Sequence, residues 1–252
     1  MVPTYREAAN LPLLIPRVAA ALAGLGGTCE IIVVDDDSRD GTEEAIARLA
    51  ETYPVRLITR TSLRDLSLAA LDGLRAARGE RLVVMDADLS HPPEAIPQLL
   101  AGLHDHEMVI GSRYVPGGQT QNWGGHRRLN SYVATALALP LARGVRDPMA
   151  GFFAIRRAVL ERARDLRPVG YKIGLELLCR GEPSVAEVPI TFPDRAHGQS
   201  KLNLRQQARY LVHLDRLYRE YRRGWGLVLR PVIWAMLGAV VVLNRCRPFM
   251  PR

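Results

Sequence analysis

The sequence predicts an α/β fold in which a mostly parallel sheet is flanked by helices. Strand-like and helix-like segments alternate from residue 30 to residue 110, and each strand-like segment is a short apolar run bounded by charged or turn residues. Alternation of this kind implies right-handed crossovers between parallel strands. The chain has 252 residues, of which 48% are hydrophobic, so it can bury a sizeable core. Ligands of such sheets bind beyond the carboxyl ends of the strands.

The elements of the alternating region follow from apolar runs and from the helical spacing between them. EIIVV is bounded by charged residues, which is typical of a buried strand. On this argument strands lie at 30–34, 55–59, 81–85 and 107–111. Helices are expected at 41–51, 66–78 and 93–103. Only Met1 and Val2 precede the first turn, so a strand at the start of the chain is expected to be nearly absent.

The rest of the globular part is less regular. Residues 112–125 are rich in Gly, Gln, Asn and Trp without a clear period, which predicts a long loop, and such loops are often functional. A helix is expected at about 126–143. A strand at 152–157, a helix to about 164 and a further extended segment at 184–192 complete this part.

The C-terminal part, 203–252, differs from the globular domain expected over residues 1–202. Apolar residues recur at helical spacing through 203–223 with Arg, Gln and His between them, which predicts an amphipathic helix. The segment 225–243 is apolar except for Arg230, but its longest uninterrupted apolar run has only 12 residues. A spanning helix needs about 20. We therefore expect a hydrophobic tail that either spans a membrane or lies in its interface.

The charge of the chain favours an anionic partner. The net charge is +8, and almost all the cations are Arg, because Lys occurs only at Lys172 and Lys201. Such a balance suits nucleic acid, an acidic membrane surface or phosphate-bearing substrates. Basic and aromatic residues are not interleaved in a recognisable nucleic-acid module, so nucleic acid is not expected as a partner. Cys29, Cys179 and Cys246 form no CxxC pair, which argues against a zinc site or a disulfide framework.

Two carboxylates follow the strand predicted at 81–85. Asp86 and Asp88 are two residues apart, and side chains with this spacing on an extended chain point the same way. Like charges this close are costly unless a cation lies between them. Mg²⁺ or Mn²⁺, bound by one or two carboxylates together with substrate phosphates, would compensate both. The alternative is a solvated turn that caps the helix expected at 93–103.

A second acidic group follows the strand predicted at 30–34. Asp35, Asp36 and Asp37 end this strand. Some of the acidic residues in this segment have a structural role, because they can cap the next helix. One carboxylate here is placed to bind a ribose or a base edge, as acidic residues do in dinucleotide folds. The sequence contains neither GxGxxG nor GxxxxGK[ST], which argues against a Rossmann oxidoreductase and a P-loop enzyme.

Eight motifs occur in a distinctive order along residues 2–205. They are PTYREAANLP, VVDDDSRDGT, RDLSLAALDGL, VVMDADLSHPPE, GSRYVPGG, DPMAGFFAIRR, GYKIGLELL and EVPITF with HGQSK. This order resembles that of the polyprenol-phosphate mannosyltransferases, the dolichol-phosphate mannose synthase group of the family 2 glycosyltransferases, which have the GT-A fold. Each motif alone is weakly or moderately specific, and the eight in order are highly specific.

The resemblance implies a reaction and its partners. A sugar, mannose from GDP-mannose in this group, passes with inversion to the phosphate of a polyprenyl or dolichyl lipid. A cation, Mg²⁺ or Mn²⁺, stabilises the charge that grows on the leaving diphosphate. The implied partners are a nucleotide-sugar donor, the lipid phosphate and a membrane, with the active site facing the cytoplasm and a membrane-protein partner possible.

The resemblance also assigns roles to residues by motif. The implied metal ligands are Asp88 and, to a lesser degree, Asp86. On the nucleotide-sugar side it implies Pro3, Tyr5, Glu7, Asp36, Asp65, Asp86, Ala87 and Asp88. The catalytic and phosphate-binding set that it implies is Asp88, Arg113, Arg127, Ser131, Arg195 and Lys201. Ser90 stands where the family often has a Gln that helps to bind metal, so the third ligand stays open.

Two rival functions remain from the sequence. A UDP-glucose-dependent transferase acting on the same lipid would have nearly the same motifs, because base and sugar pockets are assembled from scattered loop residues. A catalytically silent membrane scaffold or nucleotide-binding subunit is the rival from another class. The intact acidic pair and the set of arginines argue against the silent scaffold.

Overall fold

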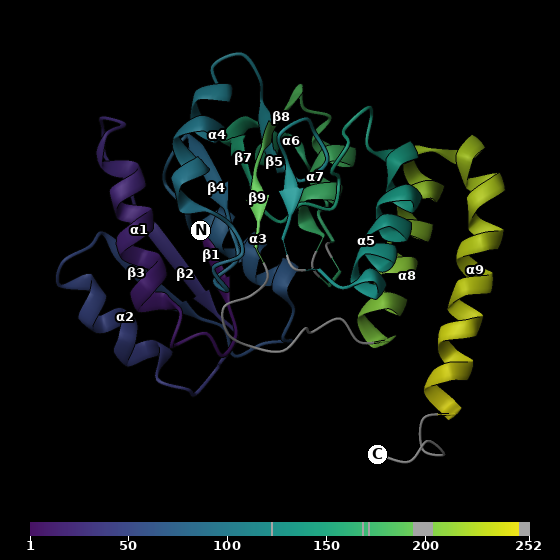
Figure 1. Ribbon diagram of the computed structural model, residues 1–252, viewed down its shortest axis with the longest axis horizontal. Coiled ribbons are helices and arrows are strands. Elements are labelled where there is room, and N and C mark those ends of the chain that lie inside the picture. Colours follow the sequence, from purple (N-terminus) through teal and green to yellow (C-terminus); the bar gives the residue numbers. More distant parts are fainter. Residues whose placement is uncertain (122, 168, 171, 194–203, 247–252) are drawn as a thin grey trace.

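The computed structural model describes residues 1–121, 123–167, 169–170, 172–193 and 204–246. A central sheet with helices on both faces forms the body of the molecule (Figure 1). Its first half contains three parallel strands in the order β1-β2-β3. These strands are β1 (Val2–Thr4), β2 (Ile31–Asp35) and β3 (Val55–Thr59). The short first strand is present, and its three residues are all buried.

The second half of the sheet has the order β4-β7-β5-β8. Strands β5 and β8 are parallel, whereas β7 is antiparallel to both β4 and β5. These strands are β4 (Arg81–Val84), β5 (Met108–Ser112), β7 (Phe153–Arg156) and β8 (Val185–Pro189). The two halves meet at Met1, whose amino group donates to the carbonyl of Val83 (2.8 Å) and whose carbonyl accepts from the amide of Met85 (3.2 Å). The expected α/β fold is confirmed, with one antiparallel strand inserted.

The helices of the globular part form two layers. On one face α1 (Leu11–Ala23), α2 (Thr42–Ala50) and α4 (Ile96–Gly102) share one hydrophobic cluster with the sheet. On the other face α3 (Leu66–Ala76), α6 (Arg157–Arg162) and α7 (Ile173–Gly181) share a second cluster. Helix α1 buries Leu11, Leu14, Ile15 and Val18, which is the spacing of one helical face. The sheet is therefore covered on both sides, as a largely parallel sheet requires.

Three helices stand together at one end of the molecule (Figure 1). They are α5 (Gly125–Ala138), α8 (Leu204–Tyr221) and α9 (Arg223–Cys246), and they share a third cluster with α7. The amphipathic helix expected at 203–223 is α8, which buries Leu211, Leu214, Leu217 and Tyr218. The predicted loop at 112–125 contains the short strand β6 (Gln119–Thr120), which pairs with β9 (Thr191–Phe192).

Two buried carboxylates hold α8 in place. Glu176 of α7 is fully buried and pairs with His213 (3.0 Å) and Arg216 (3.2 Å) of α8. Asp215 of α8 accepts from the guanidinium of Arg230 (2.6 Å) and from the indole of Trp234 (3.2 Å), both on α9. The single charge of the apolar segment therefore has its partner inside the protein. Across the described helices, none combines the length and the hydropathy needed to cross a membrane.

We expect Asp215→Ala to lower the free energy of unfolding by about 2–3 kcal/mol, because it removes the acceptor of hydrogen bonds from a charged group. Urea unfolding followed by circular dichroism measures this change. Arg219→Ala is the matched control, since Arg219 pairs with the same carboxylate (2.9 Å) but is 57% exposed, and exposed pairs contribute about 0–1 kcal/mol. Equal effects of the two substitutions would show that Asp215 does not anchor α9.

Candidate active site

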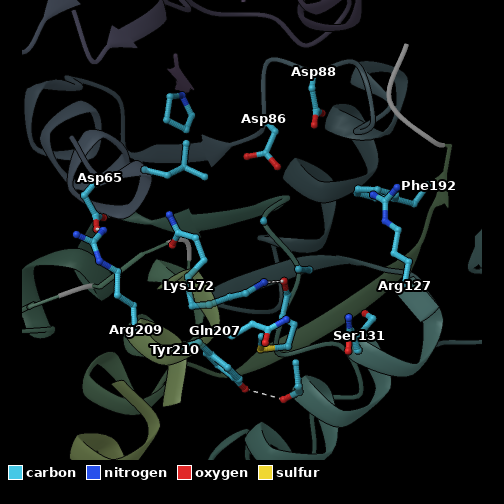
Figure 2. Close-up of a pocket in the computed structure, with 18 of the residues that line it drawn as sticks. Asp65, Asp86, Asp88, Arg127, Ser131, Lys172, Phe192, Gln207, Arg209 and Tyr210 are labelled. Carbon is cyan, nitrogen blue, oxygen red and sulfur yellow. Dashed lines mark hydrogen bonds and ion pairs between the residues drawn. The ribbon is translucent and has the colours of Figure 1, made fainter. Parts of the chain in front are cut away.

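A cavity of about 990 Å³ opens at the carboxyl ends of the strands and extends to α5, α8 and α9. One side is acidic, with Asp36, Asp65, Asp86 and Asp88 in its lining. The other side is formed by the helices at the end of the molecule and combines apolar with polar side chains. Its lining there includes Leu129, Val133, Leu137, Leu211, Met236 and Val240. Figure 2 shows Asp86 and Asp88 of the acidic side and Ser131 and Tyr210 of the helices around the same space. A cavity is therefore present where the sequence predicts the site, beyond the strand ends, and its function as the site stays a prediction.

Strand β1 and the loop after it supply one wall of the acidic side. Pro3, Tyr5 and Glu7 line the cavity there, and the guanidinium of Arg64 lies 3.9 Å from the centre of the Tyr5 ring. Glu7 accepts a hydrogen bond from the side-chain amide of Asn10 (2.6 Å). The structure thus brings together these three residues, which were chosen from the sequence for the nucleotide-sugar side. Their contact with a nucleotide stays a prediction.

Asp36 is held by two donors. It forms a buried ion pair with Arg60, whose guanidinium also binds Asp72 (2.7 Å). The other carboxylate oxygen of Asp36 accepts from the backbone amide of Asp65 (3.0 Å). Burial raises the pKa of Asp36, and the neighbouring Arg60 opposes this rise. The carboxylate is therefore fixed in orientation at the cavity wall.

Asp65 combines a structural role with its place in the lining. Its side chain caps α3 by accepting from the amides of Ser67 (3.0 Å) and Leu68 (3.3 Å). The second oxygen accepts from the amide of Gly170 (2.8 Å) and pairs with Arg209 of α8 (3.4 Å). This carboxylate thus connects the acidic side of the cavity to the C-terminal helices.

Asp86, Ala87 and Asp88 form the acidic centre of the cavity. The side chain of Asp86 is 30% exposed, whereas Asp88 is buried and accepts from both the amide and the hydroxyl of Ser90. Leu89 adopts a φ of 62°, a left-handed conformation that is uncommon for leucine. This sharp turn directs the two carboxylates toward the same space (Figure 2). Ser90 is fully buried, so its role is to support Asp88 rather than to serve as the third metal ligand.

His91 fixes the backbone of this acidic turn. Its Nδ1 accepts from the amide of Asp86 (2.9 Å), and its ring stacks on Phe152 with centroids 5.2 Å apart. Burial lowers the pKa of His91, which favours the neutral ring that this acceptor role requires. His91 thus contacts the acidic turn directly through the backbone of Asp86.

Cations and hydroxyls surround the far side of the cavity. Arg113 forms a two-pronged ion pair with the fully buried Asp147 (2.7 and 2.8 Å). The guanidinium of Arg127 lies 4.3 Å from the centre of the Trp123 ring, and the hydroxyl of Ser131 is 2.9 Å from that of Tyr114. Arg127 and Ser131 both line the cavity. Their phosphate contacts stay predictions, and Arg195 and Lys201 lie outside the described residues.

Several residues that line the cavity were not chosen from the sequence. Lys172 enters it from the start of α7, and α8 adds Gln206, Arg209 and Tyr210. The rarity of lysine was a usable signal for Lys172, whereas the α8 residues appeared only as part of an amphipathic pattern. Helix α9 was expected to serve as a tail, and it also provides part of the cavity wall.

The residues present can receive a divalent cation. Asp86 and Asp88 supply carboxylate oxygens, which Mg²⁺ and Mn²⁺ prefer. Gly151 leaves space beside them, since a Cβ there would lie 3.5 Å from a carboxylate oxygen of Asp86. Within the described part of the chain, no group of three or more His, Cys, Asp or Glu side chains is placed to hold a metal. A metal bound here would therefore need ligands from water or substrate as well.

Known proteins match both the sequence and the fold. The family described as Glycosyl transferase family 2 matches residues 1–164. The chain belongs to this family. A dolichol-phosphate mannosyltransferase from Saccharomyces cerevisiae is 42% identical over 94% of the chain and 92% of that protein. A dolichol-phosphate mannosyltransferase from Pyrococcus furiosus is 46% identical over 86% of the chain, which spans 62% of that protein.

A solved glycosyltransferase shares the fold of this family 2 chain. Glucosyl-3-phosphoglycerate synthase from Mycobacterium tuberculosis, in complex with Mn²⁺ and UDP-glucose, has a TM-score of 0.62 and 22% identity. The alignment covers 86% of the chain and 76% of that protein. This likeness supports the GT-A-like arrangement of a parallel sheet and flanking helices.

We expect His91→Phe to retain the ring stacking but to leave the Asp86 amide without its acceptor. An unsatisfied buried donor costs about 1–3 kcal/mol, and the displaced turn should weaken metal binding. His91→Asn, whose amide oxygen can accept this bond, should keep more of both properties. Urea unfolding and titration with Mn²⁺ measured by its paramagnetic resonance distinguish the variants. Indistinguishable Mn²⁺ affinities in all three proteins would remove His91 from the site.

Proposed function

We propose that this protein transfers mannose from GDP-mannose to the phosphate of a polyprenyl or dolichyl lipid, with inversion at the anomeric carbon. The observation that carries the proposal is a single cavity with two carboxylates on one side and an apolar groove on the other. A charged donor and a hydrocarbon-bearing acceptor need these two environments side by side, so that their reacting atoms can come within bonding distance. The names of the relatives from yeast and Pyrococcus support mannose and dolichyl phosphate.

The acidic side is the proposed donor site. Asp86 and Asp88 would hold Mg²⁺ or Mn²⁺ against the diphosphate, and Pro3, Tyr5 and Asp36 would line the nucleoside. When bound, the metal supplies positive charge that stabilises the diphosphate as it leaves. The chain contributes the fixed orientation of these groups, because Ser90 holds Asp88 and His91 holds the backbone of Asp86.

In the transfer step, an oxygen of the acceptor phosphate forms a bond to the anomeric carbon. The bond from this carbon to the diphosphate oxygen breaks, and its electron pair leaves with the nucleoside diphosphate. The acceptor phosphate is already ionised near neutral pH, so the chain need not provide a strong general base. Its task is to hold the two reactants in line, which alone lowers a barrier substantially. Arg127 and Ser131 are the proposed contacts for the acceptor phosphate.

The apolar side is the proposed path of the isoprenoid chain. Its lining comes from three helices, represented by Leu137 of α5, Leu211 of α8 and Met236 of α9. Burying each CH₂ contributes about 0.8 kcal/mol, so a groove of this kind can hold the first units of the chain. The remainder of the lipid stays in the bilayer, which requires the cavity to lie close to a membrane.

Helix α9 is the proposed membrane-facing element of residues 203–252. Its outer side exposes large apolar side chains, namely Trp225, Leu227, Val228, Val232 and Trp234. Apolar groups exposed together on one helix mark interaction surfaces, and tryptophan favours the interfacial region of a bilayer. We propose that α9 lies in the interface of the cytoplasmic leaflet, where GDP-mannose would reach the cavity from the aqueous side.

A transfer assay tests the proposed function. The protein is incubated with radiolabelled GDP-mannose or UDP-glucose, Mg²⁺ or Mn²⁺ and a polyprenyl phosphate, and the lipid is extracted into organic solvent. Label from GDP-mannose in the lipid phase is the expected result. Label from UDP-glucose would favour the glucosyltransferase instead. Absence of label with either donor would favour the scaffold.

We expect Asp88→Asn to lower the transfer rate by at least about 100-fold, because it removes charge from the group that holds the cation. The substitution conserves size, so the melting temperature should change little. Excess EDTA added to the wild-type protein should have a comparable effect that Mn²⁺ reverses. Near wild-type turnover in EDTA would exclude the metal-dependent mechanism.

We expect the double substitution Leu227→Ser and Val228→Ser to reduce binding to anionic liposomes by about tenfold or more, since full burial of each side chain contributes about 1.5–3 kcal/mol. These residues are 79% and 64% exposed, so the fold should tolerate the change. Leu13→Ser on the distant helix α1, where Leu13 is 52% exposed, is the matched control. Sedimentation with liposomes measures binding, and unchanged sedimentation would exclude α9 as the membrane contact. Activity on detergent-dispersed acceptor should persist.

A further inference from the structure

Lys172 occupies a central position in the cavity. It is the residue immediately before α7 (Ile173–Gly181), and its ammonium group donates to the carbonyl of Met149 (2.8 Å). Figure 2 shows it below Asp86 and above Tyr210, with Arg127 and Ser131 to one side. All five residues line the same cavity. Lys172 therefore lies where the acidic donor side meets the apolar groove.

Several cations line the cavity, and Lys172 is the one that stands at this junction. Arg113 lies nearby, but Asp147 accepts from its backbone amide and from two nitrogens of its guanidinium. This buried pair is neutral as a unit. Arg127 enters from α5 on the far side of the cavity (Figure 2). An anion at the junction of the two sides would thus lie beside the ammonium of Lys172 (Figure 2).

The surroundings of Lys172 disfavour its charge until an anion arrives. Burial lowers the pKa of Lys172 to about 7, Arg113 adds to this effect, and Asp147 and Asp86 oppose it. A phosphate in contact with the ammonium would compensate the charge and raise the pKa again. The bond to Met149 uses one of the three N–H groups of an ammonium and sets the direction of the side chain.

We propose that Lys172 is a catalytic residue whose ammonium donates a hydrogen bond to the phosphate of the lipid acceptor during the transfer. This inference rests on the proposed function and adds a specific contact to it. An acceptor oxygen forms the new bond to the anomeric carbon, while Lys172 contacts another oxygen of the same phosphate. The ammonium keeps its proton throughout, and the electron pair of the broken bond leaves with the nucleoside diphosphate. The compact charge of lysine aligns the acceptor phosphate, and the donor diphosphate is left to the metal.

The test separates this role from that of a structural brace on Met149. Lys172→Met retains the length of the side chain but removes the charge and the donor, whereas Lys172→Arg retains a charge. Arg48→Met removes one cation from the exposed surface of α2 and controls for net charge. For each protein, calorimetry measures the affinity for GDP-mannose, and the affinities for a two-isoprene alcohol and for its phosphate ester.

The expected result is specific to the phosphate. Lys172→Met should lose about 10- to 100-fold in affinity for the phosphate ester, the range for one hydrogen bond to a charged group. Its affinity for the alcohol and for GDP-mannose should stay within about twofold of wild type, and kcat/KM for the acceptor should fall in parallel. Lys172→Arg should recover part of the preference for the phosphate ester, and Arg48→Met should match wild type.

Two outcomes would overturn the inference. One is a loss of GDP-mannose affinity in Lys172→Met equal to the loss for the phosphate ester, which would mark a brace or a donor contact. The other is an unchanged preference for the phosphate ester. Both are distinct from failure of the proposed function, in which the wild-type protein itself transfers no label from GDP-mannose to lipid. Thermal unfolding of Lys172→Met checks that it folds, and Lys172→Arg carries the comparison if it does not.

Discussion

The compensation of closely spaced carboxylates is the constraint on which this structure depends. Asp36, Asp65, Asp86 and Asp88 line one side of a single cavity, and like charges in such proximity repel strongly when they are shielded from water. Three of them, Asp36, Asp65 and Asp88, accept hydrogen bonds from other groups of the protein, including Arg60, Arg209, Ser90 and several backbone amides. These bonds hold the carboxylates in fixed positions. On the proposed function, this order exists before the donor binds and lowers the cost of aligning it.

The sequence predicted those parts of the fold that depend on local pattern. The alternating strands, the amphipathic helix α8 and the acidic turn at Asp86 and Asp88 all follow from spacing within a few residues. Helix α7, which is buried on nearly all sides, was not predicted from the sequence. The antiparallel direction of β7 was also missed, since an apolar run contains no information about strand direction.

The partners of the site residues were harder to predict than the residues themselves. Arg113 was expected at a phosphate, and the structure pairs it with Asp147, which lies 34 residues away in the sequence. Asp65 was expected beside the nucleotide, and it also caps α3 and reaches Arg209 of α8, 144 residues away. Pairings over such distances arise from the topology of the sheet and the docking of the C-terminal helices. A motif shows that a charged residue is present. The neighbours of that residue in space determine whether its charge is compensated within the protein or is available to a ligand.

Helix α9 has two faces with different surroundings. The inner face contributes Met236 and Val240 to the cavity and is fastened to α8 through Asp215, while the outer face exposes Leu227 and Val228. On the proposed function, this one helix would take part in two binding events, and these events would be thermodynamically linked. Any surface that favours the docked position of α9 raises the affinity of the groove, and by reciprocity an occupied groove raises the affinity for that surface. The bilayer would then act as an activating ligand of the enzyme, in addition to being the reservoir of its acceptor.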